Sequence, residues 1–96
     1  MMIEFQKLSG IYKITNTTNG KIYIGHSINM TMRWYIHLDN LMKGQHPNCK
    51  LQEDFNRYGV DAFSFSVLEF VIGKEELIKK EQDYLNGLDF STNYNI

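Results

Sequence analysis

The sequence has 96 residues, enough for one domain with a modest core, because a chain this short buries only about 60% of the surface that its unfolded form exposes. No stretch approaches the ~20 apolar residues that span a bilayer, and a single cysteine excludes an internal disulfide, so the interior of a cell is the expected setting. The net charge of −1 hides an asymmetry, since basic residues dominate from residue 13 to 50 and acidic ones from 51 to 96. This pattern indicates either an anionic partner for the first half or an unevenly charged solvated surface.

Residues 9–15 and 21–26 are predicted to form a β-hairpin. Both runs are rich in strand-forming residues, and Asn19-Gly20 between them is a strong turn signal. Because side chains alternate along a strand, Ile11 should share one buried face with the isoleucines of the second run. The other face should then gather and expose two phenols, those of Tyr12 and Tyr23.

The exact pairing within the hairpin depends on the turn. A two-residue turn at Thr17-Thr18 places Tyr12 directly opposite Tyr23. A turn at Asn19-Gly20 shifts the pairing by two places and keeps the faces. A five-residue loop would flip one strand, and the isoleucine pattern disfavours it.

The rest of the chain is predicted to form two helices, a strand and a third helix. Residues 29–43 carry apolar side chains at helical spacing. Residues 47–58 should form the second helix, with Pro47 in the first turn and Gly59 as the C-terminal cap. Residues 63–71 alternate as a strand does, and residues 74–86 return to helical spacing.

Glu81 is unusual because it lies within the apolar face of the third predicted helix, four residues from both Leu77 and Leu85. Carboxylates are rarely buried unless they are paired or bind a metal ion. Two simpler explanations remain open: a salt bridge at the edge of the core, or a helix rotated so that Glu81 points to solvent.

Arg33 and His37 are four residues apart on the first predicted helix and therefore lie one above the other. A guanidinium supplies a permanent charge with a planar fork of donors, and an imidazole titrates near neutral pH, so the pair suits a phosphate. A solvent-facing pair without chemistry is the alternative. His26 follows the second tyrosine run and has no clear partner.

Several motifs together resemble the GIY-YIG endonuclease family, and most closely the catalytic domains of phage and intron-encoded homing endonucleases. Gly10-Ile11-Tyr12 and Tyr23-Ile24-Gly25 match the two tripeptides that name the family. Arg33-Trp34-x-x-His37 resembles its arginine helix, Glu81 sits where it keeps a metal-binding glutamate, and Tyr94-Asn95-Ile96 resembles its closing motif. The resemblance covers residues 9–96 of a single domain, 1–96, and leaves residues 1–8 as an extension.

The resemblance implies an α/β fold in which a small three-stranded antiparallel sheet is flanked by about three helices. It also implies metal-dependent hydrolysis of DNA phosphodiester bonds, with Mg²⁺ or Mn²⁺ held by Glu81. Tyr12 would take a proton from the attacking water. A free phenol has a pKa of about 10, so Tyr12 would need help, which Tyr23 and Lys21 are placed to give. Arg33 would neutralise the charge that develops on the phosphate.

The remaining implied roles concern the substrate. His37 is implied as a further catalytic residue, and Lys21, His46 and Asn95 as residues that bind or orient the phosphate. His26 departs from the family, in which small polar residues are common at that place.

The resemblance further implies DNA as the partner, no membrane association, and a place in the cytoplasm of a bacterial or phage-infected host cell. Specificity would come from a separate DNA-binding domain or a partner protein, and double-strand cleavage from a transient dimer on DNA or from sequential nicks. Two other functions stay open: a non-catalytic nucleic-acid-binding or interaction module on the same scaffold, and a restriction or repair nuclease of the same family.

Overall fold

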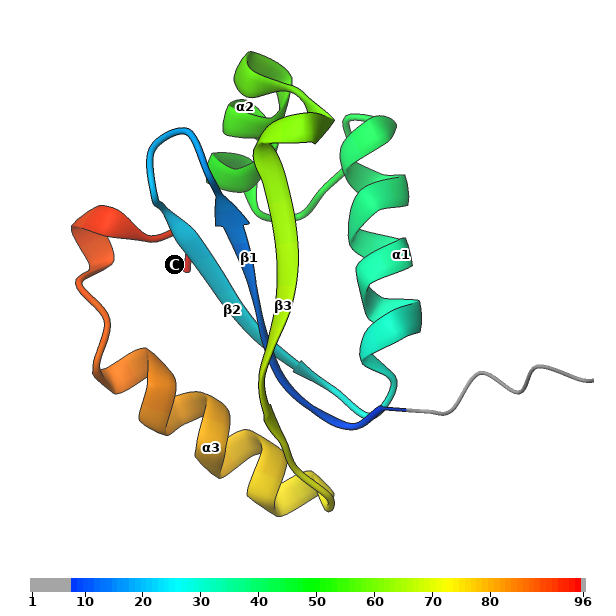
Figure 1. The fold of residues 1–96 in the computed structure, drawn as a ribbon, viewed down its shortest axis with the longest axis vertical. Helices are drawn as coiled ribbons and strands as arrows, with labels where there is room; N and C mark the ends of the chain where they lie inside the picture. Colours follow the sequence, from blue (N-terminus) through cyan, green and yellow to red (C-terminus); the bar gives the residue numbers. More distant parts are fainter. Residues whose placement is uncertain (1–7, 96) are drawn as a thin grey trace, which may run out of the picture.

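The computed structural model describes residues 8–95, so residues 1–7 of the predicted extension and the final residue of the closing motif lie outside it. The elements in chain order are β1 (Gly10–Asn16), β2 (Ile22–Ser27), α1 (Met30–Met42), α2 (Cys49–Tyr58), β3 (Phe63–Phe70) and α3 (Lys74–Asn86), with short 3₁₀ turns at Val60–Ala62 and Phe90–Thr92. The strands form one antiparallel sheet in the order β2-β1-β3, which confirms the predicted α/β fold (Figure 1). No helix within residues 8–95 is long and apolar enough to cross a membrane.

Both faces of the sheet are covered, because α1 and α3 flank it on opposite sides (Figure 1). The face toward α3 carries a core cluster that consists of Ile11, Ile24, Val71 and Leu77. The other face carries a larger cluster, which consists of Tyr12, Ile14, Met30, Leu41, Leu51, Phe55, Ala62, Phe63 and Tyr94. The isoleucines therefore share one face as predicted. The expected exposure of Tyr12 is wrong, since its side chain is only 1% exposed.

The hairpin register differs from both predicted two-residue turns. Tyr12 lies opposite Gly25, and Ile14 lies opposite Tyr23. Residues 17–20 form a four-residue loop, which is closed by a hydrogen bond from the Gly20 N–H to the carbonyl of Asn16. The two tyrosines keep a common face but are offset by two positions along the strand pair.

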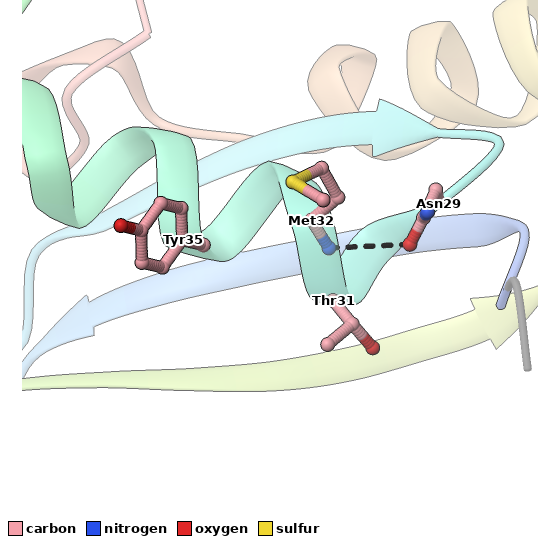
Figure 2. Close-up of a pocket in the computed structure, with 4 residues that line it drawn as sticks. All are labelled: Asn29, Thr31, Met32 and Tyr35. Atoms are coloured by element: carbon pink, nitrogen blue, oxygen red, sulfur yellow. Dashed lines mark hydrogen bonds between the residues drawn. The ribbon is translucent and has the colours of Figure 1, made fainter. Parts of the chain in front are cut away.

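Asparagine side chains cap the starts of α1 and α2. Asn29 accepts a hydrogen bond from the Met32 N–H at the start of α1 (Figure 2). Asn48 accepts one from the Leu51 N–H at the start of α2. The second helix therefore begins two residues later than predicted, and Pro47 precedes its cap rather than entering its first turn. Gly59 ends α2 with φ of 83°, as predicted for a C-terminal cap.

Helix α3 is held against the sheet by apolar and polar contacts. Leu77 is buried, the Tyr84 hydroxyl donates to Glu69 of β3 at 3.0 Å, and Lys80 lies 3.5 Å from the same carboxylate. Glu81 follows Lys80 and is turned by about 100° around the helix, toward β2 rather than β3. The docking of α3 thus determines where the Glu81 carboxylate lies.

Candidate active site

Tyr12 has a buried hydroxyl at the centre of the structure. Its ring stacks on Phe65 with centroids 4.9 Å apart, and its oxygen lies 2.7 Å from His37 Nε2. A Cβ atom at position 25 would overlap the phenol oxygen, so Gly25 is required for the ring to lie across β2. The two glycine-tyrosine tripeptides are therefore complementary: the glycine of the second makes room for the tyrosine of the first.

A chain of hydrogen bonds assigns the protonation of two histidines. The Asn48 backbone N–H donates to His46 Nδ1 at 3.0 Å, so His46 carries its proton on Nε2. That nitrogen lies 2.7 Å from His37 Nδ1 and donates to it. The neutral His37 must then carry its own proton on Nε2 and donate it to the Tyr12 oxygen. Tyr12 is thus an acceptor from His37, and its own hydroxyl proton is free for another partner.

Burial determines the protonation states of the residues in this hydrogen-bond chain. It lowers the pKa of His37 from 6.5 to about 3, with further lowering from the Arg33 guanidinium, so His37 is neutral at physiological pH. Burial also lowers the pKa of His46. The pKa of Tyr12 is raised, mainly by burial, whereas Arg33 acts to lower it. The hydroxyl of Tyr12 is therefore a phenol in the free protein, and any role as a base requires additional positive charge nearby.

A pocket of about 310 Å³ opens at the edge of the sheet, beside the hydrogen-bond chain of His37 and His46. It is lined by Tyr23, Arg33, His46, Pro47, Asn48 and Asn95. The Tyr23 ring meets the His37 and His46 rings edge-on, and burial raises its pKa while Arg33 lowers it. The guanidinium thus lies within range of both phenols. The pocket combines one permanent cation with neutral imidazole and amide groups, which is a suitable lining for an anion.

Glu81 approaches the site from the other face of the sheet. Its Oε2 atom lies 2.6 Å from His26 Nδ1, and its negative charge raises the pKa of both Tyr12 and Tyr23. The side chain is 24% exposed, so it is neither buried in the apolar face nor turned fully to solvent. The structure therefore pairs the Glu81 carboxylate at the core edge, and its hydrogen-bond partner is His26, for which no partner was predicted.

A divalent cation is implied by the resemblance, and the donor set at Glu81 fits one. Mg²⁺ and Mn²⁺ prefer oxygen ligands and retain several waters, so a single accessible carboxylate is sufficient. Within residues 8–95, no three His, Cys, Asp or Glu side chains gather where they could hold a metal ion. The protein would thus supply one acidic ligand and leave most coordination positions open.

The other predicted site residues lie in different surroundings. His37 is only 1% exposed, and its two ring nitrogens are engaged with Tyr12 and His46, so it presents no free polar atom to the pocket. Asn95 lines the pocket, but its side chain makes two 2.8 Å hydrogen bonds to the backbone of Ile24 and so ties the C-terminal segment to the edge of β2. Lys21 lies at the hairpin end in a separate pocket with Asp54 and does not line the pocket that contains Arg33.

Two further residues contribute to the site without a sequence signal that assigns their roles. Asn48 supplies the backbone N–H that begins the histidine chain, and a backbone group leaves no trace in the residue type. His26 was visible as a departure from the family pattern, but only the docking of α3 brings it to Glu81.

Comparison with known proteins gives a consistent result. The family model described as GIY-YIG catalytic domain matches residues 8–95. The chain is 40% identical over 90 residues to "Intron-associated endonuclease 1" of Enterobacteria phage T4, covering 92% of this chain and 36% of that protein. It is 34% identical over 92 residues to "Probable intron-encoded endonuclease 1" of Neurospora crassa, covering 90% of this chain and 29% of that one. The chain thus spans about a third of the length of these relatives.

A solved structure matches the fold closely. The catalytic domain of the homing endonuclease I-TevI superposes with a TM-score of 0.85 at 38% identity, covering 92% of this chain and 97% of that chain. The chain therefore belongs to the GIY-YIG catalytic domain family, which is a family of nuclease domains. Its fold is that of a homing-endonuclease catalytic domain.

Proposed function

We propose that this chain is the catalytic domain of a DNA endonuclease that requires a divalent metal ion. The observation that carries the proposal is the hydrogen-bond chain that ends at Tyr12, placed beside a pocket containing Arg33 and within reach of the Glu81 charge. The names of the relatives, which are intron-associated or intron-encoded endonucleases, support a homing-type role over a restriction or repair role.

Charge neutralisation is the first requirement of phosphodiester hydrolysis. Arg33 lines the open pocket, so its fork of donors is available to two phosphate oxygens. Removal of one such contact from a transition state typically costs about 3–4 kcal/mol. Arg33 also lowers the pKa of Tyr12 and Tyr23, and so favours the ionised form of both phenols.

Proton transfer from the attacking water is the second requirement. Tyr12 is suited to accept this proton once its own hydroxyl proton has passed to water in the adjacent pocket, because the Nε2–H of His37 then stabilises the negative charge on its oxygen. His46 and the Asn48 N–H hold His37 in the donating tautomer. His37 and His46 therefore act as positioning residues for Tyr12, and His46 lines the pocket with both its ring nitrogens engaged.

A divalent ion bound by Glu81 would add positive charge near the phosphate and the tyrosines. Without the ion, burial and, to a lesser extent, the Glu81 carboxylate raise the pKa of Tyr12, which opposes the use of Tyr12 as a base. Mg²⁺ or Mn²⁺ is the cofactor that this oxygen ligand favours.

The setting follows from the same proposal. The substrate is DNA inside a bacterial or phage-infected host cell, and target choice is supplied by a separate DNA-binding domain or a partner protein. One site cuts one strand, so a double-strand break requires a transient dimer on DNA or two successive nicks.

The test is plasmid cleavage by purified chain with Mg²⁺, compared with Arg33→Ala and Glu81→Ala. Both variants should unfold near the wild-type temperature and lose cleavage. Two matched controls remove exposed charges elsewhere: Arg57→Ala on α2 removes a positive charge, as Arg33→Ala does, and Asp83→Ala on α3 removes a negative charge, as Glu81→Ala does. Both controls should cut normally. Cleavage retained by either site variant contradicts the proposal. DNA binding without nicking by the wild type would instead indicate the non-catalytic module.

A further inference from the structure

His26 and Glu81 make a short contact that the fold does not need for its stability. The two side chains come from β2 and α3, and their facing atoms are 2.6 Å apart, although 39% of His26 and 24% of Glu81 are exposed. A pair with this exposure contributes little to stability, because water screens its charges. Packing of Leu77 and the Tyr84 hydrogen bond already dock α3, so the fold does not depend on this pair.

The geometry of the pair is close to that of two ligands on one metal ion. Bonds of about 2.1 Å from an ion to a nitrogen and an oxygen at right angles separate those two atoms by about 3.0 Å. The Nδ1 and Oε2 atoms would therefore have to move apart by only a few tenths of an ångström. Both side chains have the exposure to make that adjustment.

We infer that His26 and Glu81 together form a nitrogen and oxygen site for a divalent transition-metal ion, so that this domain binds Mn²⁺ or Ni²⁺ in preference to Mg²⁺. The inference rests on the proposed function, because the ion is the cofactor of that same site, and adds a ligand that the family resemblance does not supply. Imidazole favours Ni²⁺, Zn²⁺ and related ions, whereas carboxylate and water alone suit Mg²⁺.

The site remains open for catalysis even with two protein ligands. Structural metal sites are closed by four ligands, but within residues 8–95 no third His, Cys, Asp or Glu joins this pair. The other coordination positions stay available to water and phosphate oxygens. His26 follows Gly25, which lies opposite Tyr12, so such an ion would sit at the same end of the β1–β2 pair as that phenol.

Metal binding without DNA tests the inference independently of cleavage. Mn²⁺ binding is followed by electron paramagnetic resonance, and competition by Ni²⁺ and Mg²⁺ gives their relative affinities. Pulsed measurements on the Mn²⁺ complex should show a directly coordinated imidazole nitrogen. His26→Ser should abolish this nitrogen signal and weaken Mn²⁺ and Ni²⁺ binding by about tenfold or more, since even outer-shell losses cost about 10–100-fold. Its Mg²⁺ affinity should change little.

Two further variants complete the design. His26→Gln keeps a hydrogen-bond donor to Glu81 but no imidazole, and should behave as His26→Ser does; wild-type metal preference in this variant would show that His26 only orients Glu81. Asp83→Asn, on the exposed face of α3, should bind metal as the wild type does and controls for helix charge.

The results separate this inference from the proposed function. If Glu81→Ala abolishes both binding and cleavage while His26→Ser leaves the nitrogen signal and the ion preference unchanged, the inference is wrong and the endonuclease proposal stands. If His26→Ser instead tightens the binding of every ion, His26 competes with the metal for Glu81, which also overturns the inference.

Discussion

Substitution of Gly25 by alanine tests whether the buried phenol lies where the structure places it. The added Cβ would overlap the oxygen of Tyr12 and lie 3.0 Å from its Cε2. The ring has little room to retreat, because it is 1% exposed, stacked on Phe65 and hydrogen-bonded to His37. Gly25→Ala must therefore displace the phenol or the strand.

The expected magnitude follows from these contacts. Overpacking of a filled core costs about 1–3 kcal/mol. If the displaced phenol leaves the His37 N–H without a partner, a further ~1–3 kcal/mol is lost. For a domain of this size each kcal/mol lowers the melting temperature by about 4–8 °C. Catalysis should suffer more, because misplacement of a reacting group by about 1 Å can cost ~100-fold in rate.

Thermal unfolding and single-turnover DNA cleavage measure the two effects. Gly87→Ala is the matched control, since the nearest atom to its Cβ would be the Tyr84 carbonyl oxygen at a comfortable 3.7 Å. Tyr12→Phe should relieve part of the strain of Gly25→Ala, with a coupling of about 0.5–3 kcal/mol between the two sites. Wild-type stability and wild-type cleavage in Gly25→Ala would refute the placement of Tyr12.

Three other outcomes are expected. Burial lowers the pKa of His37 from 6.5 to about 3, so the contribution of neutral His37 to the free energy of unfolding is complete above pH 6.5 and is lost as the pH falls toward 3. The loss is at most about 1.4 kcal/mol per pH unit. In urea unfolding, His37→Gln should flatten this dependence of the free energy of unfolding on pH. His46→Ala removes the donor to His37, so ¹⁵N spectra should show a tautomer mixture and cleavage should fall by about 10–100-fold, a part of the ~10²–10⁴ that a general base contributes. A unique His37 tautomer in that variant would contradict the assigned chain. Asn95→Ala breaks both bonds to Ile24 and should destabilise the C-terminal segment by about 1–3 kcal/mol, seen as faster amide exchange at Ile24; unchanged exchange would count against the tether.

The elements of the fold were accessible from the sequence because each carries a local signal. Alternation of isoleucines identified the face of β1 and β2 that packs on α3, and Gly59 marked the end of α2. The register was not accessible, because Thr17-Thr18 and Asn19-Gly20 are both acceptable turns and the observed loop uses all four residues. The start of α2 was misplaced because Asn48, a stronger cap, follows Pro47 directly.

The candidate active site could be predicted from the sequence only in part. Spacing along α1 brought Arg33 and His37 to one face, but it could not show that His37 is buried and donates to Tyr12. A helix rotation of about 100° separates Lys80, which contacts Glu69, from Glu81, and sequence spacing does not resolve such an angle. Tertiary docking alone determines which of these side chains reaches β2.

The roles of Lys21 and Asn95 could not be predicted from residue type and spacing either. Lys21 was predicted to share a strand with Tyr23, yet it precedes β2 and lies at the hairpin end in a different pocket. Asn95 reaches the expected pocket, but its amide is used by the backbone of Ile24. Residue type and spacing indicate a region of the structure, whereas the hydrogen-bond partner that decides a role comes from the packed fold.

In the proposed mechanism, the buried phenol of Tyr12 accepts a proton during DNA hydrolysis. The most direct measurement is the single-turnover rate of DNA cleavage by Tyr12→Phe, relative to wild type, with saturating divalent metal. The variant keeps the ring and its stack on Phe65 and should remain folded. We expect its rate to fall by about 100-fold or more, the usual contribution of a general base. Cleavage within a few-fold of the wild-type rate would contradict the assignment of Tyr12 as the base.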